Sequence, residues 1–115
     1  MKTALITGAS RGIGNAIALH LKKEGYHVLG TATSSAGASK LEEEGIEGLV
    51  LDLNSIESKE QFWEQVEKKE IQISVLVNNA GITRDNIVLR MSEDEWEDIM
   101  NVNLNGAFYL SKKVL

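Results

Sequence analysis

The feature that most constrains this chain is a glycine-rich segment near its N-terminus, residues 7–14, which reads TGASRGIG. Residues 3–7 form a short apolar run with β-branched side chains, and residues 12–24 place Ile13, Ile17 and Leu21 at helical spacing. The order strand, tight turn, helix is therefore expected. Three glycines in such a turn allow a sharp bend, admit a ligand against bare backbone and let the helix pack closely on the sheet.

The alternation of strand and helix continues along the chain. Apolar runs predict further strands at residues 27–33, 48–51 and 73–77. Helical periodicity predicts helices at residues 38–44, at 55–69 and from Ser92 onward. The chain has no proline, which is a common helix stop, so glycines are expected to end the helices instead, at Gly25 and Gly45. Capping-box spacing at positions 54 and 57, 58 and 61, and 92 and 95 marks the starts of two of these helices.

Short connections between successive strands require right-handed crossovers, which produce a parallel sheet. The sequence thus predicts an α/β fold, a Rossmann-type doubly wound parallel sheet with helices on both faces. This fold is expected to form one domain over residues 1–115. The last helix keeps its apolar pattern up to Leu115, so the domain is expected to be incomplete at its C-terminus.

Composition excludes several classes of function. The net charge of -5 and the absence of a Lys/Arg block argue against nucleic acid as a partner. The chain has no cysteine, so a disulfide framework and a thiolate metal site are excluded, and no metal site is expected. The first apolar run is too short for a signal peptide or a membrane span. We therefore expect a cytoplasmic protein without a membrane partner.

The glycine-rich turn predicts a phosphate site. Unpaired amide groups at the start of a helix, together with the positive end of the helix dipole, bind an anion without a cationic side chain. A turn of this kind after a strand and before a helix is typical of dinucleotide binding. The alternative is a plain glycine-rich turn in which Arg11 is a solvated surface charge.

The end of the second predicted strand favours NADP(H) over NAD. NAD-type sites place a carboxylate there to bind the ribose hydroxyls. Residues 31–34 read TATS, and Glu42 is the first carboxylate that follows. Nothing therefore repels a 2′-phosphate, which Arg11 and the hydroxyls of Thr33 and Ser34 could bind.

Two motifs together resemble the short-chain dehydrogenase/reductase family: the turn at residues 7–14 and the sequence NNAG at residues 78–81. Within that family, residues 31–34, the run 78–86 and Met91, Trp96 and Asn103 look like the 3-oxoacyl-[acyl-carrier-protein] reductases of bacterial fatty-acid synthesis. The resemblance spans the whole chain. It implies NADPH-dependent reduction of a 3-oxoacyl group on acyl carrier protein to the 3-hydroxyacyl product, by a homotetramer. This chain would supply its NADP-binding part.

The resemblance also implies residue roles along the cofactor. Asp52 and Leu53 would flank the adenine, and Thr33 would lie by the 2′-phosphate. The phosphates and ribose would be contacted by Gly8, Ser10, Arg11, Gly12, Ile13 and Gly14. Along the fourth strand, toward the nicotinamide, the cofactor would be contacted by Asn79, Ala80, Gly81 and Ile82. Alternatives remain: Asp52 as a helix cap, and Asn78 and Asn79 as ordinary turn residues.

Asn103 is the one candidate catalytic residue. It falls in the middle of an apolar stripe of the last predicted helix, formed by Trp96, Ile99, Met100, Ala107, Leu110 and Val114. A buried amide needs partners, and helix interiors disfavour Asn, so the position is a functional candidate. The resemblance implies that Asn103 holds a water in a proton relay. The alternative is a core amide with a purely structural role.

The family's catalytic serine, tyrosine and lysine are not found in residues 1–115, so this chain alone is expected to be inactive. Tyr109 and Lys113 have the Tyr-x-x-x-Lys spacing, but they lie too close to Asn103, and Tyr109 is expected on a helix surface or a subunit interface. Leu104, Phe108 and Leu115 form a second apolar line suited to pairing with another copy. Other readings are a family member acting on a small ketone or alcohol, and a non-catalytic nucleotide-binding module.

Overall fold

The computed structural model describes residues 2–81 and 92–115. Strands and helices alternate through the first of these ranges: β1 (Thr3–Ile6), α1 (Gly12–Lys23), β2 (His27–Ala32), α2 (Ser35–Glu43), β3 (Glu47–Val50), α3 (Ile56–Lys68) and β4 (Val75–Val77). The second range is helical throughout: α4 (Glu93–Ile99), the π-helix η2 (Met100–Asn105) and α5 (Gly106–Val114). The predicted order of elements is confirmed.

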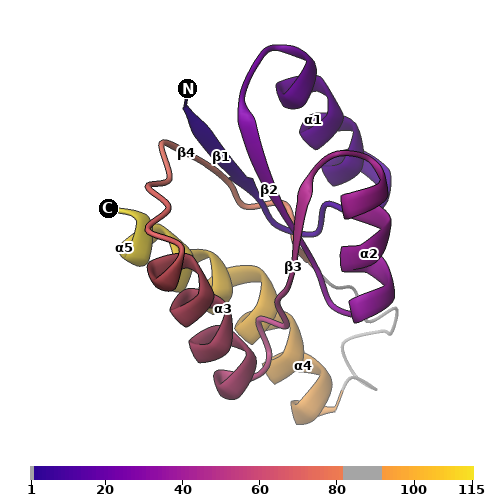
Figure 1. Ribbon diagram of the computed structural model, residues 1–115. Coiled ribbons are helices and arrows are strands. Elements are labelled where there is room, and N and C mark those ends of the chain that lie inside the picture. Colours follow the sequence, from indigo (N-terminus) through magenta and orange to yellow (C-terminus); the bar gives the residue numbers. More distant parts are fainter. Residues whose placement is uncertain (1, 82–91) are drawn as a thin grey trace.

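The four strands form one parallel sheet in the order β3-β2-β1-β4. The chain moves outward from β1 to β3 and then returns to the other side of β1 as β4, so the direction of winding reverses between β1 and β4. Helices α1 and α2 cover one face of the sheet, and α3 and α5 cover the other (Figure 1). The predicted doubly wound sheet with helices on both faces is therefore confirmed. Ligands of such sheets bind where the carboxyl ends of the strands meet at the reversal.

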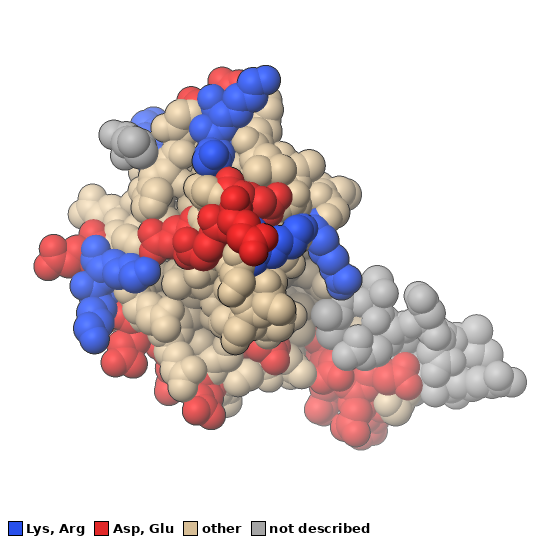
Figure 2. Space-filling model, turned by 45° about the vertical axis from the view of Figure 1, so that its right-hand side comes forward, with Lys and Arg blue, Asp and Glu red and all other residues tan. Residues whose placement is uncertain are grey.

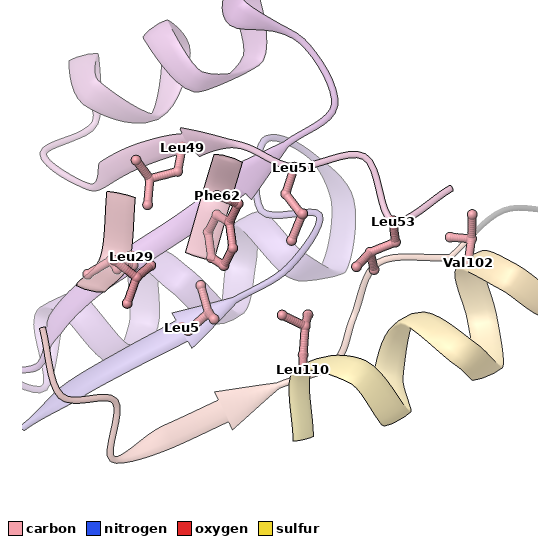
Figure 3. Close-up of a cluster of buried hydrophobic side chains, with 9 residues drawn as sticks. Leu5, Leu29, Leu49, Leu51, Leu53, Phe62, Val102 and Leu110 are labelled. Carbon is pink, nitrogen blue, oxygen red and sulfur yellow. The ribbon is translucent and has the colours of Figure 1, made fainter. Parts of the chain in front are cut away.

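Alternate residues of each strand supply two separate cores. Ala4, Ile6 and Val28 pack beneath α1 and α2, whereas Leu5 and Leu29 point to the opposite face. On that opposite face, Leu49, Leu51, Leu53, Phe62, Val66, Val102 and Leu110 complete a cluster of buried side chains (Figure 3). Because both faces are covered, β1 is buried along its whole length rather than on alternate residues.

Serine side chains define the starts of three helices. The hydroxyls of Ser34, Ser55 and Ser92 each accept a hydrogen bond from the amide three residues later. The cap predicted at Ser92 is confirmed. The capping boxes predicted at Asn54 and Ser58 are wrong, because Ser55 between them is the cap of α3. The cap at Ser34 also starts α2 three residues before the predicted position.

The last helix departs from the predicted pattern because η2 interrupts it. A π-helix closes i→i+5 hydrogen bonds and turns less per residue than an α-helix, so the faces before and after it fall out of step. The buried positions are Val102, Gly106 and Leu110. Trp96 is 57% exposed and Asn103 is exposed, so the predicted apolar stripe through these two residues is wrong.

Charged side chains are dispersed over the described surface. On the face drawn in Figure 2, Lys and Arg form small groups among Asp and Glu, and no broad basic field covers the described residues there. Among the helices of residues 2–81 and 92–115, none is long and apolar enough to cross a membrane.

Phe62 is the largest side chain buried against the sheet from α3. We expect Phe62→Ala to lower the free energy of unfolding by about 3–5 kcal/mol, because it removes buried contacts and leaves a cavity. Ile56→Ala in the same helix is the matched control, since Ile56 is 72% exposed; its effect should stay within about 0.5 kcal/mol. Denaturant unfolding of the complete gene product measures both, and equal effects would contradict the packing described.

Candidate functional site

A cavity of about 460 Å³ opens at the carboxyl ends of β1, β2 and β4. This is the edge of the sheet where the winding reverses. Segments far apart in the sequence form its walls: the glycine-rich turn, the end of β2, the segment after β3, the segment after β4, and η2. The lining residues are Gly8, Ser10, Arg11, Gly12, Ala32, Thr33, Leu51, Asp52, Leu53, Asn79, Ala80, Gly81 and Val102.

Three glycines shape the turn between β1 and α1. Gly8 and Gly12 both have φ of +62°, a conformation that side-chain-bearing residues rarely adopt. A Cβ on Gly14 would overlap the Gly8 carbonyl oxygen and the Asn79 side-chain nitrogen, so only glycine fits there. A Cβ on Gly12 would meet no atom within 4 Å. Bare backbone at Gly12 therefore leaves open space for a ligand beside the turn.

The first amides of α1 are available to an anion. The first hydrogen bond of this helix runs from the Asn15 amide to the Arg11 carbonyl oxygen, at 3.3 Å. The amides of residues 12–14 precede it and have no acceptor within their own helix. They lie at the positive end of the helix dipole, so the turn can bind a phosphate through its main chain.

The buried hydroxyl of Thr7 joins this turn to the segment that follows β4. Its Oγ1 accepts hydrogen bonds from the Asn79 amide at 3.0 Å and from the Ala80 amide at 2.8 Å. The Asn79 side-chain amide in turn donates to the Gly8 carbonyl at 3.1 Å. The alternative of Asn79 as an ordinary turn residue does not describe these contacts, because they join the end of one strand to the end of another.

Other contacts fix the β2 and β3 sides of the cavity. The Thr31 hydroxyl accepts from the Gly8 amide at 3.2 Å, and the Thr31 carbonyl accepts from the Ala9 amide at 2.8 Å. Asp52 Oδ1 accepts from the Asn54 amide at 2.9 Å and forms a local turn. The alternative of Asp52 as the cap of α3 is wrong, since that cap is Ser55.

Most of the predicted cofactor residues lie together in this cavity: Gly8, Ser10, Arg11, Gly12, Thr33, Asp52, Leu53, Asn79, Ala80 and Gly81. The Ile13 side chain is 75% exposed and Gly14 packs behind the turn, so neither lines the cavity. Ile82 lies outside the described residues. Ala32, Leu51 and Val102 also line the cavity and were not predicted; the first two directly precede predicted residues, and the placement of Val102 depends on η2.

Asn103 lies against Gly81. A Cβ on Gly81 would lie 3.0 Å from Asn103 Oδ1, so glycine permits the close approach of η2 to the segment after β4. The argument that Asn103 is an amide buried in an apolar stripe is wrong, because the residue is exposed. Its placement next to the cavity comes instead from the changed phase of the π-helix.

Tyr109 is not part of the cavity. Its hydroxyl donates to the Lys59 carbonyl at 3.2 Å, and its ring packs against the core cluster beside α3. Tyr109 is therefore half-buried beside α3 rather than fully on the helix surface, and a position at a subunit interface stays a prediction. Burial, followed by the nearby charges of Glu60 and Glu67, raises the pKa of Tyr109 above its usual value of 10.0. A raised pKa makes Tyr109 a poorer proton donor near neutral pH. This agrees with the interpretation of the sequence, in which Tyr109 and Lys113 are not the catalytic pair.

Metal ligands are not gathered in the part of the chain that the structure describes. Residues 2–81 and 92–115 contain no group of three or more His, Cys, Asp or Glu side chains placed to hold a metal ion. His27 Nε2 lies 3.4 Å from Glu47 Oε1, at the opposite edge of the sheet from the cavity. The described lining of the cavity offers main-chain amides, the Asn79 side chain and the charges of Arg11 and Asp52.

Comparison with known proteins identifies relatives along the whole chain. The family model described as short chain dehydrogenase matches residues 2–115. The chain is 53% identical over 120 residues to the 3-oxoacyl-[acyl-carrier-protein] reductase FabG of Pseudomonas aeruginosa. It is 50% and 46% identical over 117 residues to the proteins of the same name from Vibrio harveyi and Escherichia coli. These alignments cover 99% of the chain and 49%, 48% and 48% of the relatives, so the chain spans about half their length.

Solved structures of a dehydrogenase share the fold described above. A 4-hydroxyisoleucine dehydrogenase complexed with NADH superposes with a TM-score of 0.90, and a mutant complexed with NADH and succinate superposes with a TM-score of 0.89. Both are 26% identical to this chain, cover 99% and 98% of it, and are themselves covered to 48% and 47%.

The Thr7 hydroxyl should be necessary for the shape of the cavity. Thr7→Val keeps the shape of the side chain but leaves the part-buried Ala80 amide without its acceptor, so the free energy of unfolding should fall by about 1–3 kcal/mol. Dinucleotide affinity should fall as well, because the turn and the segment after β4 separate. Thr7→Ser retains the hydroxyl and should preserve affinity. Denaturant unfolding and ligand titration measure these effects, and equal affinity of the Val and Ser variants would contradict the proposed role.

Proposed function

The chain belongs to the short-chain dehydrogenase family, and from that membership we propose that its cavity holds a nicotinamide dinucleotide, with NADPH preferred over NADH. The observation that carries this proposal is the glycine-rich turn, with its uncapped helix amides and the space beside Gly12. The diphosphate rests on the amides of residues 12–14 at the start of α1. The NADH complexes of the 26% identical dehydrogenase structures support a cofactor of this class.

The remaining walls of the cavity fit the rest of such a cofactor. Leu53 and Asp52 flank the adenine, and residues 79–81 run along the cofactor toward the nicotinamide, with Ile82 beyond them. Ile13 contributes its main-chain amide rather than its side chain, and Gly14 acts by letting α1 approach the turn. When bound, the cofactor supplies a hydride to a carbonyl carbon, and the residues of this chain bind and orient it.

The preference for NADPH follows from the charges near Thr33. Thr33 and Arg11 both line the cavity, and α2 has no acidic residue in its first turn. Glu42, the first carboxylate after β2, accepts a hydrogen bond from the Gly48 amide at 3.0 Å and is thereby held against β3. A 2′-phosphate near Thr33 meets one guanidinium and no opposing carboxylate on this side. The Ser34 oxygen accepts the capping hydrogen bond of α2, which leaves the O–H of this predicted phosphate ligand able to donate to a phosphate.

We extend the proposal to the activity of the complete protein: reduction of a 3-oxoacyl group on acyl carrier protein to the 3-hydroxyacyl product, in the cytoplasm. Relatives that are 46–53% identical support this substrate over the 4-hydroxyisoleucine of the 26% identical structures. Asn103, beside Gly81, is proposed to hold a water in the proton relay. The exposed side chains of Leu104 and Phe108 support assembly with further copies into a homotetramer.

Activity of the complete gene product tests the substrate. It should oxidise NADPH in the presence of a 3-oxoacyl group on acyl carrier protein, and residues 1–115 alone should show no turnover, because the expected serine, tyrosine and lysine are not among them. The loss of NADPH absorbance as the cofactor is oxidised measures the rate. Turnover of small alcohols with none of the acyl carrier protein substrate would contradict the proposal.

Arg11→Met should separate the two cofactors. Loss of a charge-assisted contact to the 2′-phosphate should weaken NADPH binding by roughly ten- to a hundredfold, whereas NADH binding should change by less than about twofold. Arg11→Lys should recover part of the loss, because it restores the charge without the bidentate geometry. Fluorescence titration measures the four dissociation constants. An equal loss of affinity for NADPH and NADH would mean that Arg11 maintains the shape of the turn and does not bind the 2′-phosphate.

A further inference from the structure

A lysine on α2 contacts the glycine-rich turn at the rim of the cavity. The Nζ of Lys40 donates a hydrogen bond to the main-chain carbonyl of Ser10, which is 30 residues earlier in the chain. Ser10 lines the cavity, and the Lys40 side chain is exposed. The sequence pattern did not predict this contact, because only the packing of α2 beside the turn brings the two residues together.

Close packing fixes where this part of α2 lies. A Cβ on Gly37 would lie 2.6 Å from the Ala32 Cβ and 3.4 Å from the Ser10 side chain. Ala32 and Ser10 both line the cavity, and Thr33 directly follows Ala32. The first half of α2 therefore rests on the same wall of the cavity that Thr33 forms. The Lys40 ammonium lies against this wall through its bond to Ser10.

Among the described residues, no carboxylate of α2 forms an ion pair with the Lys40 ammonium. Glu42 is bonded to the Gly48 amide, and Glu44 at the end of α2 accepts from the Asn15 side chain at 2.9 Å. Across the cavity, Asp52 is bonded to the Asn54 amide. Arg11 lines the cavity, and Lys40 reaches it through its bond to Ser10, so two cations lie on the side of the cavity formed by Ser10.

We propose that Lys40 is a second cationic ligand of the cofactor's 2′-phosphate and acts with Arg11 to select NADPH. This inference rests on the proposed function and adds a specificity-determining residue to it. A lysine ammonium has three N–H donors, and the Ser10 carbonyl uses one of them, which leaves two for phosphate oxygens. The bond to Ser10 also holds the long side chain over the turn, so less rotamer freedom is lost when the phosphate binds.

The test uses the complete gene product with Lys40→Met, Lys40→Arg and Lys23→Met. Lys40→Met should weaken NADPH binding by about three- to tenfold and leave NADH binding within about twofold. Lys40→Arg keeps the charge and should retain most of the NADPH affinity. Lys23→Met removes the same charge from an exposed position at the far end of α1 and should change neither affinity. The difference between Lys40→Met and the parent protein should shrink as salt is raised.

The outcomes separate this inference from the proposed function. If the parent protein itself binds NADH as tightly as NADPH, the proposed cofactor preference is wrong and the role of Lys40 fails with it. If the parent prefers NADPH and Lys40→Met keeps that preference, only the role of Lys40 is wrong. An equal loss of both cofactors in Lys40→Met also overturns the inference, because it would make Lys40 a structural brace for Ser10.

Discussion

The cavity depends on one buried hydroxyl that holds two strand ends together. Thr7 follows β1, and its Oγ1 accepts from the amides of Asn79 and Ala80 after β4. These segments are about seventy residues apart in the chain, but the return of β4 to the side of β1 makes them neighbours. Gly14 and Gly8 complete the arrangement, because side chains there would separate the turn from Asn79. We expect the first amides of α1, which are proposed to bind the cofactor, to keep their position only while this junction is intact.

The fold was largely predictable because β1 and β2 are buried along almost their whole length and because glycines end α1 and α2. Gly25 and Gly45 end helices with positive φ, as their positions indicated. The errors have local causes. Ser34 and Ser55 act as caps that the spacing rules assigned elsewhere, and η2 changes the phase of the last helix. A π-helix leaves no periodic signature of its own, so the exposure of Asn103 and Trp96 could not be derived from an α-helical projection.

The candidate site was predictable where one short segment carries the chemistry, as in the turn that contains Gly8, Arg11 and Gly12. It was less predictable where distant segments meet. Lys40 reaches Ser10 only because Gly37 lets α2 lie on the turn, and Val102 joins the wall because Gly106 permits η2 and α5 to approach Leu53. The spacing rules also missed the cap at Ser34, whose hydroxyl oxygen accepts from the Gly37 amide and starts α2.

The central claim is that main-chain amides of the glycine-rich turn bind the diphosphate of the cofactor. Amide NMR shifts of the ¹⁵N-labelled complete gene product during NADPH titration test it most directly. The account predicts large, saturable shifts for residues 8–14 and small shifts for Gly25 and Gly45, which also have positive φ but lie in turns outside the cavity. Saturation with NADPH while the amides of residues 12–14 stay unchanged would contradict it.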